Sequence, residues 1–169
     1  MQEVLKEKGI TVVHVVSSVK FALKAEEAGV DAIVCEGFEA GGHNGREETT
    51  TFTLIPIVKE QLKIPVIAAG GIASGRGMLA AMVLGADGVQ IGSRFAATEE
   101  SSAHQNFKNI IIDVKDGDTQ VTLKELAPVR LVKNKFYNDV QELYLQNPSK
   151  EKLKELLGRA RAKKGMFEK

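Results

Sequence analysis

The sequence predicts an α/β fold in which short parallel strands alternate with helices. Two observations support this prediction. Within residues 1–97, four short apolar runs lack polar alternation, which is the pattern of strands buried on both faces of a parallel sheet. Each of the first three runs is followed by a stretch with helical spacing, and repeated strand–loop–helix units of this kind are typical of α/β proteins.

Four strands and three helices account for this region in order. Pro56 places the start of the second helix at Leu54, because proline is tolerated only in the first helical turn. Gly29 and Gly85 end the first and third helices, as expected at C-terminal caps. The strands are expected at Ile10–Val16, Asp31–Cys35, Ile64–Ala69 and Gly88–Ile91, and the helices at Val19–Ala28, Leu54–Leu62 and Gly75–Leu84.

Two segments of this region repeat one another weakly. Residues 27–34 and 84–91 each contain a helix end, a glycine turn, an aspartate and a strand. Repeated units of this kind build a (β/α)₈ barrel, although a doubly wound open sheet would show them too. The repeat therefore favours a parallel α/β architecture, but it does not distinguish a closed barrel from an open sheet.

The chain changes character after about Arg94. Residues 98–169 hold most of the remaining charge and no strand pattern as strong as the first four, so we expect a helical extension there. Its last helix should be capped by the turn at residues 147–149, and the basic run at residues 159–164 is interpreted as a solvated helix end. The expected helices are Ser102–Val114, Asn138–Leu145 and Ser149–Arg161.

Composition argues against several classes of function. The formal net charge is +1 and no apolar run approaches the roughly 20 residues of a membrane helix, so neither nucleic acid nor a membrane is expected as a partner. The N-terminus lacks the apolar core of a signal peptide, and a single cysteine fits a reducing cytoplasm. With three histidines and one cysteine, no metal site is expected.

The loop Glu36–Gly45 carries the first candidate for chemistry. His43 stands among small residues after a buried strand, so its imidazole could act as a base near neutral pH. The alternative is a structural histidine that bonds loop carbonyls. Glu36 and Glu39 could orient His43 or bind a ligand, and they rank below it. Cys35 belongs to the strand and is expected to pack as a small hydrophobe.

Two glycine pairs follow the next two strands. Gly70–Gly71 and Gly92–Ser93 would let a ligand approach the backbone, and the following helix N-terminus offers free N–H donors. Loops at the same edge of a (β/α)₈ barrel often bind phosphate. The alternative is that glycine serves only the turn geometry. Two pairs in consecutive units, the second with a hydroxyl, favour a phosphate site.

Three ordered motifs, Glu36–His43, Ile64–Ile72 and Val89–Phe95, resemble the nitronate monooxygenase family, which also contains FMN-dependent enoyl-acyl-carrier-protein reductases. The resemblance spans nearly the whole chain, and Glu36–Thr51 looks especially close to reductase-type members. It implies a (β/α)₈ barrel that holds FMN at the carboxyl ends of its strands. The implied reaction is oxidation of alkyl nitronates by O₂ to carbonyl compounds and nitrite, or else reduction of an enoyl thioester by NAD(P)H through FMN.

The resemblance also assigns roles to individual residues. By resemblance, His43 is the active-site histidine. Ala40, Gly41 and Gly42 shape the substrate pocket. Gln90 lies near the flavin, and the residues that meet the FMN phosphate are Gly70, Gly71, Gly92 and Ser93, with serine keeping the hydroxyl of the threonine common at that position.

The four strands look like the family's fifth to eighth, whereas a complete barrel takes about 250 residues. We therefore expect residues 1–97 to be the C-terminal half of a barrel, with the first four strands absent before Met1 and a final glycine-rich segment absent at the other end. Exposed sheet edges predict aggregation or a need for a partner. Two copies could close a barrel as a homodimer, and an inactive fragment or half-barrel assembly module is the non-enzymatic alternative.

Another enzyme class would also suit the glycine loops. An IMP dehydrogenase-like oxidoreductase or a phosphosugar isomerase binds phosphate at comparable positions of a barrel. The dehydrogenase needs a cysteine in the loop, where this sequence has His43, while Cys35 stands in the strand. This class is therefore the less favoured alternative.

Overall fold

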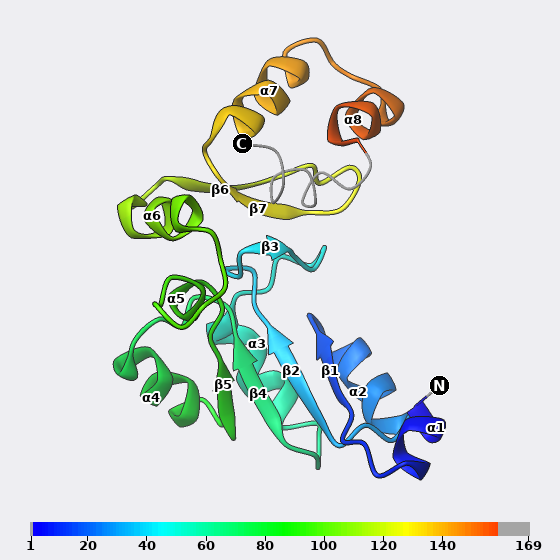
Figure 1. Ribbon diagram of the computed structural model, residues 1–169. Helices are drawn as coiled ribbons and strands as arrows, with labels where there is room; N and C mark the ends of the chain where they lie inside the picture. The colour runs from blue at the N-terminus through cyan, green and yellow to red at the C-terminus, as the bar shows by residue number, and fades with distance from the viewer. Residues whose placement is uncertain (1, 159–169) are drawn as a thin grey trace. The chain divides into compact units, whose positions relative to one another are not determined.

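The computed structural model describes residues 2–158, which fall into two compact units divided between Arg94 and Phe95. In the first unit the helices are short and regularly spaced between strands (Figure 1). Its elements are α1 (Gln2–Glu7), β1 (Val13–Val16), α2 (Val19–Glu27), β2 (Ala32–Glu36), β3 (Gly42–His43), α3 (Thr51–Lys59), β4 (Val66–Ala69), α4 (Gly75–Val83) and β5 (Gly88–Gln90), with α5 (Ser93–Ala96) at the boundary.

The first unit is built on a four-stranded parallel sheet in the order β1-β2-β4-β5. Val16 pairs with Cys35, Cys35 with Ala68, and Ala68 with Val89, so one continuous row crosses the sheet. This arrangement confirms the predicted α/β class and the predicted strand–helix alternation. Among the described residues, β1 and β5 form the two edges of the sheet.

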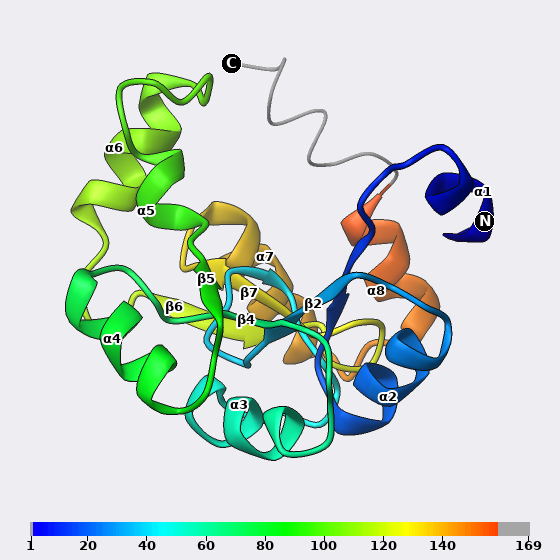
Figure 2. The same cartoon turned by 90° about the horizontal axis from the view of Figure 1, so that it is seen from below.

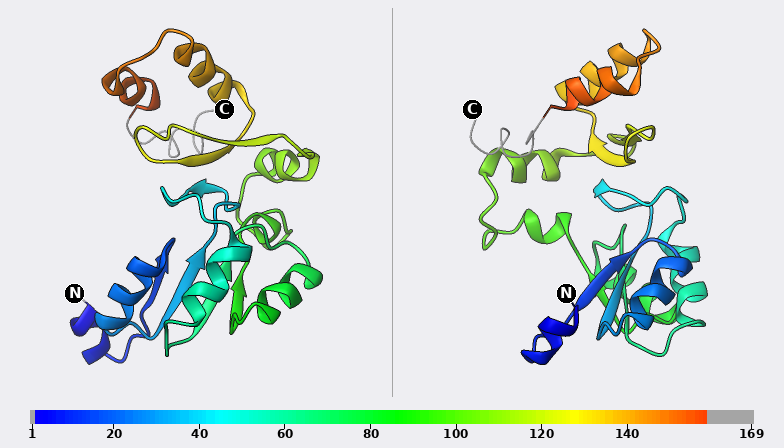
Figure 3. Two further views of the ribbon diagram at one scale, coloured as in Figure 1. Left: turned by 180° about the vertical axis from the view of Figure 1, so that it is seen from behind. Right: turned by 90° about the vertical axis from the view of Figure 1, so that its right-hand side faces the viewer.

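The two faces of the sheet differ. Helices α2, α3 and α4 cover one face (Figures 2 and 3), where Val16, Ile33, Cys35, Val66 and Ala68 join the main hydrophobic core. Strand register places the alternate residues on the opposite face. On that open face the side chains of edge strand β1 are half exposed, at 46% for Val13 and 50% for Val15.

Cys35 lies within the helix-side core, fully buried. Desolvation raises the pKa of its thiol to about 12, so the thiolate needed for nucleophilic chemistry is scarce at neutral pH. The prediction that Cys35 packs as a small hydrophobe is therefore confirmed. A reaction that requires a loop cysteine finds none in this part of the chain.

The two segments of the weak sequence repeat form the same set of hydrogen bonds and ion pairs around an aspartate. The Asp31 carboxylate accepts the Val12 N–H at 2.7 Å, while the Asp31 N–H donates to Val12 O at 2.8 Å. Asp87 makes the matching pair of bonds to Val66, both 2.8 Å. Lys6 and Lys59 supply an ammonium group to the two carboxylates, at 3.1 and 2.6 Å. We call these two arrangements the aspartate clamps.

Helix α3 begins earlier than predicted. It starts at Thr51, so Pro56 lies in its interior and not in its first turn. Proline removes the N–H that would donate to the carbonyl of Phe52. Phe52 is 70% exposed, so water can serve that carbonyl instead. The earlier start follows from a contact outside the helix, because the Thr51 N–H donates to the carboxylate of Glu39 at 2.9 Å.

The second unit contains a β-hairpin that the sequence analysis missed. β6 (Thr119–Thr122) and β7 (Val129–Val132) pair antiparallel, from Thr119↔Val132 to Thr122↔Val129, between α6 (Gln105–Asp113) and α7 (Lys135–Tyr144). Both strands have only four residues, and Arg130 interrupts the apolar residues of β7, so the sequence pattern of the hairpin is weak. The region is therefore not purely helical.

The helices of the second unit lie close to their predicted positions. Ser149 caps α8 (Lys150–Leu157), its hydroxyl accepting the Lys152 N–H at 3.4 Å as the sequence predicted. Leu123, Val140 and Leu153 form a small core of their own. The basic run at residues 159–164 lies outside the described residues. No helix in the described part of the chain has the length and apolar character needed to cross a membrane.

Loss of an aspartate clamp should destabilise the sheet in a pH-dependent way. The Lys59 ammonium, followed by the Val66 N–H, holds the pKa of Asp87 below its ordinary value of 3.8. Its contribution is thus present above that value and is lost as the pH falls through the lower, folded-state pKa. Asp87→Ala should lower the free energy of unfolding by about 1 kcal/mol at neutral pH.

Urea denaturation checks this expectation. The difference between wild type and Asp87→Ala should shrink below about pH 3.8. Asp116→Ala, at an exposed turn of the second unit, is the control and should be nearly neutral. A difference that grows on acidification would contradict the clamp.

Candidate functional site

The carboxyl ends of the parallel strands meet at one edge of the sheet. Register places Glu36, Ala69 and Gln90 side by side in the last row of β2, β4 and β5. Their Cβ atoms share the open face, because row partners point to the same side of a sheet. Immediately beyond this row stand the loop that begins at Gly37 and the two glycine pairs. Ligands of parallel α/β proteins bind at such an edge.

Thr51 joins three segments at this edge. Its buried hydroxyl lies 2.9 Å from the carbonyl oxygen of Gly70 and 3.0 Å from the Glu39 carboxylate, with Ala69 O at 3.2 Å. A hydroxyl carries one proton, so it donates to one of these acceptors at a time. The Thr51 N–H gives Glu39 a second bond. The loop after β2, the start of α3 and the end of β4 are thereby held together.

Glycine is required at Gly37 and Gly70 by this contact. A Cβ at Gly37 would overlap the Thr51 hydroxyl and backbone, and a Cβ at Gly70 would come within 2.8 Å of Gly37 O. Gly70 also has φ +99°, a region unfavourable for residues with a side chain. Glycine at this position therefore serves first to let the histidine loop pack against the end of β4.

The histidine loop presents His43 on its exposed side, in the two-residue strand β3. A Cβ at Gly41 would lie 3.8 Å from the Ser93 hydroxyl, so the loop reaches the residue that follows β5. At its other end, Gly45 packs against Ser17, just after β1. The loop thus spans the edge from β1 to β5. Of the loop residues assigned to the site from the sequence, Gly41 lies beside Ser93.

The residues assigned to a phosphate fit such a group. Gly92 is exposed, and no heavy atom lies within 4 Å of the position that its Cβ would occupy. Gly71 has φ +69° and leads toward α4, whose first turn carries Arg76 and no acidic residue. Exposed backbone and a cationic helix start are favourable to a phosphate dianion. Gln90 is also exposed, in the last row of the sheet.

The two loop carboxylates have different environments. Glu39 accepts both the N–H and the hydroxyl of Thr51, so it holds the loop in place. A role for Glu39 in orienting His43, considered from the sequence, stays a prediction. Glu36 ends β2 and is half-buried, and desolvation raises the pKa of its carboxyl group. Glu36 therefore remains a candidate for contact with a ligand on the open face.

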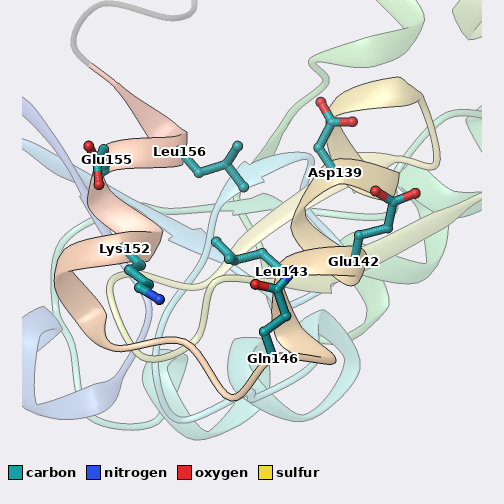
Figure 4. Close-up of a pocket in the computed structure, with 7 residues that line it drawn as sticks. All are labelled: Asp139, Glu142, Leu143, Gln146, Lys152, Glu155 and Leu156. Atoms are coloured by element: carbon teal, nitrogen blue, oxygen red, sulfur yellow. The ribbon is translucent and has the colours of Figure 1, made fainter.

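The second unit has polar features of its own. His104 caps α6, its Nδ1 accepting the Asn106 N–H at 3.1 Å. Within the part of the chain that the structure describes, no three His, Cys, Asp or Glu side chains gather to hold a metal ion. A hollow of about 380 Å³ lies between α7 and α8 (Figure 4), lined by Asp139, Glu142, Leu143, Gln146, Lys152, Glu155 and Leu156, none of them a predicted site residue.

Comparison with known proteins identifies the family. The family model described as nitronate monooxygenase matches residues 1–167. The chain belongs to the nitronate monooxygenase family. It is 41% identical over 150 residues to a probable nitronate monooxygenase of Staphylococcus saprophyticus. The aligned residues make up 83% of this chain and 42% of the relative. A probable nitronate monooxygenase of Staphylococcus aureus is 40% identical over 149 residues, with the same coverage.

Solved structures agree with this membership. FabK from Thermotoga maritima superposes with a TM-score of 0.79 at 48% identity, over 85% of this chain and 46% of that one. Nitroalkane oxidase from Streptomyces ansochromogenes gives 0.71 at 32% identity, over 80% and 42%. The fold is therefore that of the (β/α)₈ barrel family, and the relatives belong to a family of flavin-dependent oxidoreductases. It spans about two fifths of the length of the curated relatives.

A methyl group at Gly70 should disrupt the edge of the sheet. Gly70→Ala imposes a strained φ and a contact with Gly37 O, and we expect the free energy of unfolding to fall by about 1–3 kcal/mol. Gly75→Ala is the matched control, because its Cβ would meet nothing within 4 Å at the start of α4. It should be neutral or stabilising by about 0.5 kcal/mol.

Thermal or urea denaturation of the two variants measures the difference. Equal stability of Gly70→Ala and Gly75→Ala would mean that the loop does not pack on the end of β4 as described.

Proposed function

We propose that the chain carries the active-site edge of an FMN-dependent nitronate monooxygenase. The observation that carries the proposal is the placement of an exposed His43 on a glycine loop that reaches Ser93 across the carboxyl edge of a parallel sheet. Membership of the family and the similarity to a nitroalkane oxidase support it. The proposed substrate is an alkyl nitronate or the parent nitroalkane.

The residues that would hold FMN are those at the ends of β4 and β5. Gly71, Gly92 and Ser93 would receive the phosphate through exposed backbone and a hydroxyl. Gly70 would support them through its packing against the loop. Gln90 would lie toward the flavin from the open face. When bound, FMN would supply the redox chemistry that oxidises the substrate and reacts with O₂.

His43 would act as a base. A neutral nitroalkane is oxidised only after loss of its α-proton, and a neutral imidazole can accept that proton. The proton would pass to a nitrogen of the His43 ring, and the substrate would become the nitronate anion. Ala40, Gly41 and Gly42 carry no long side chains, so a small substrate could approach His43 along the loop backbone. With a preformed nitronate, His43 would bind and orient the anion.

A second candidate function is FMN-dependent enoyl-acyl-carrier-protein reduction with NAD(P)H. It is favoured by the resemblance of Glu36–Thr51 to reductase-type members and by the higher identity to FabK, 48% against 32% for the nitroalkane oxidase. In that reaction His43 would position the thioester or donate a proton to it. The same loop would serve either substrate, because each presents a planar group with at least one oxygen atom to the histidine.

Two assays on one protein separate the candidates. The protein is a hybrid in which this chain replaces the matched part of the Staphylococcus saprophyticus relative, and the 169-residue chain with added FMN is measured beside it. Oxygen uptake with propionate 3-nitronate supports the monooxygenase, whereas NAD(P)H oxidation with crotonoyl-CoA supports the reductase. A folded hybrid that binds FMN and performs neither reaction would contradict both proposals and favour a non-enzymatic role.

Replacement of His43 should remove activity without removing FMN. In the hybrid, His43→Ala should lower kcat/KM for the neutral nitroalkane by about 10²–10⁴-fold, the usual contribution of a general base. The flavin absorbance should remain, because His43 is not among the residues proposed to hold the phosphate. The control is His14→Ala, at an exposed position of β1, which should change kcat/KM less than twofold. Full activity of His43→Ala would exclude it as the base.

A further inference from the structure

The loop that carries His43 needs something to fix its shape. Three of the residues nearest His43 are Gly41, Gly42 and Gly45, and Gly42 has φ +90°. Glycine has more conformational freedom than any other residue, so such a loop does not hold one shape through its own backbone preferences. A base in this loop would therefore sample many directions unless a contact restrained it.

Asn44 supplies that contact from the position directly after His43. Its side-chain Nδ2 donates to the carbonyl oxygens of Ala40 and Gly42, both at 3.0 Å. The carbonyl of Gly42 belongs to the peptide unit that leads into His43. The backbone on both sides of the histidine is therefore fixed, from one side by the Gly42 peptide and from the other by Asn44 itself.

The orientation of the Asn44 amide follows from its partners. Both partners are acceptors, so the nitrogen and not the oxygen must face them. The oxygen, Oδ1, is then buried without a hydrogen-bond partner. Buried polar atoms of this kind are uncommon. The contribution of the Asn44 amide is therefore its two donated bonds. An aspartate has the same shape, but it would place an oxygen against both carbonyl oxygens and repel them.

We propose that Asn44 is the positioning residue for His43. Its two hydrogen bonds close the segment from Ala40 to Asn44 into one conformation and so direct the imidazole toward the substrate. This inference rests on the proposed function, in which His43 is the base. Asn44 does not touch the substrate, and it acts only through the histidine.

Hydrogen exchange tests the restraint without reference to activity. In the 169-residue chain, Asn44→Ala and Asn44→Asp should speed amide exchange at least several-fold in residues 41–45 of the loop and leave α2 and α4 unchanged. The matched control is Asn138→Asp, at an exposed position of α7, which should leave the loop unchanged. Unchanged exchange of the loop in both Asn44 variants would overturn the proposal.

A double-mutant cycle in the hybrid tests whether Asn44 acts through His43. Asn44→Ala should lower kcat by about 10–100-fold, as expected for a misplaced catalytic group, with a smaller effect on KM. In the His43→Ala background the same change should have no further effect on kcat. An equal loss in both backgrounds would make Asn44 an ordinary structural residue and overturn the proposal.

The two arms also separate failure of this inference from failure of the proposed function. If the hybrid performs neither reaction, the proposed function fails, and this inference fails with it. If the hybrid is active and His43→Ala leaves the rate unchanged, His43 is not the base and this inference fails alone. If His43→Ala abolishes the reaction while Asn44→Ala does not alter kcat, the proposed function stands and the positioning role is refuted.

Discussion

The carboxyl edge of the sheet depends on one buried hydroxyl group, that of Thr51. It fills the space between the loop after β2 and the end of β4, and it is within hydrogen-bond distance of acceptors in both segments. Because this oxygen occupies that space, Gly37 and Gly70 must lack side chains. Because they lack side chains, the loop lies against the sheet and carries His43 to the edge where Ser93 begins α5.

The Thr51 contact also separates the roles of the two nearby carboxylates, Glu39 and Glu36. The Glu39 carboxylate sits at the first N–H of α3, where a helix favours negative charge. It is therefore part of the framework, although it stands in the most informative motif of the sequence. Glu36 points from the last row of the sheet to the open face, where burial favours its neutral form. In a closed (β/α)₈ barrel that face is the interior.

The sequence allowed prediction of the features that depend on local pattern. Apolar runs gave the four parallel strands, and Gly29 and Gly85 gave the helix ends. The start of α3 was placed three residues late, at Leu54, although the run Thr49–Thr51 is itself typical of a helix start; its first N–H is bonded to Glu39, twelve residues from Thr51. The β6–β7 hairpin was missed because its strands are short and become buried only against helices. Asn44 was overlooked because an amide in a loop is informative only when its partners are known.

The aspartate clamps have a consequence for how this architecture can arise. Asp31 ties the start of β2 to β1, and Asp87 ties the start of β5 to β4, each with a lysine from the preceding part of its own unit. In these two strand–helix–strand segments, the aspartate and the N–H that it accepts both belong to the segment itself, and only the lysine comes from the helix before it. A gene segment of this size could be duplicated and still join its strands in register, without new compensating changes at that end. Substitutions at the carboxyl end of the sheet, where His43 lies, could then change the reaction of one copy. The aspartate clamp at the amino end would keep the strands of that copy in register.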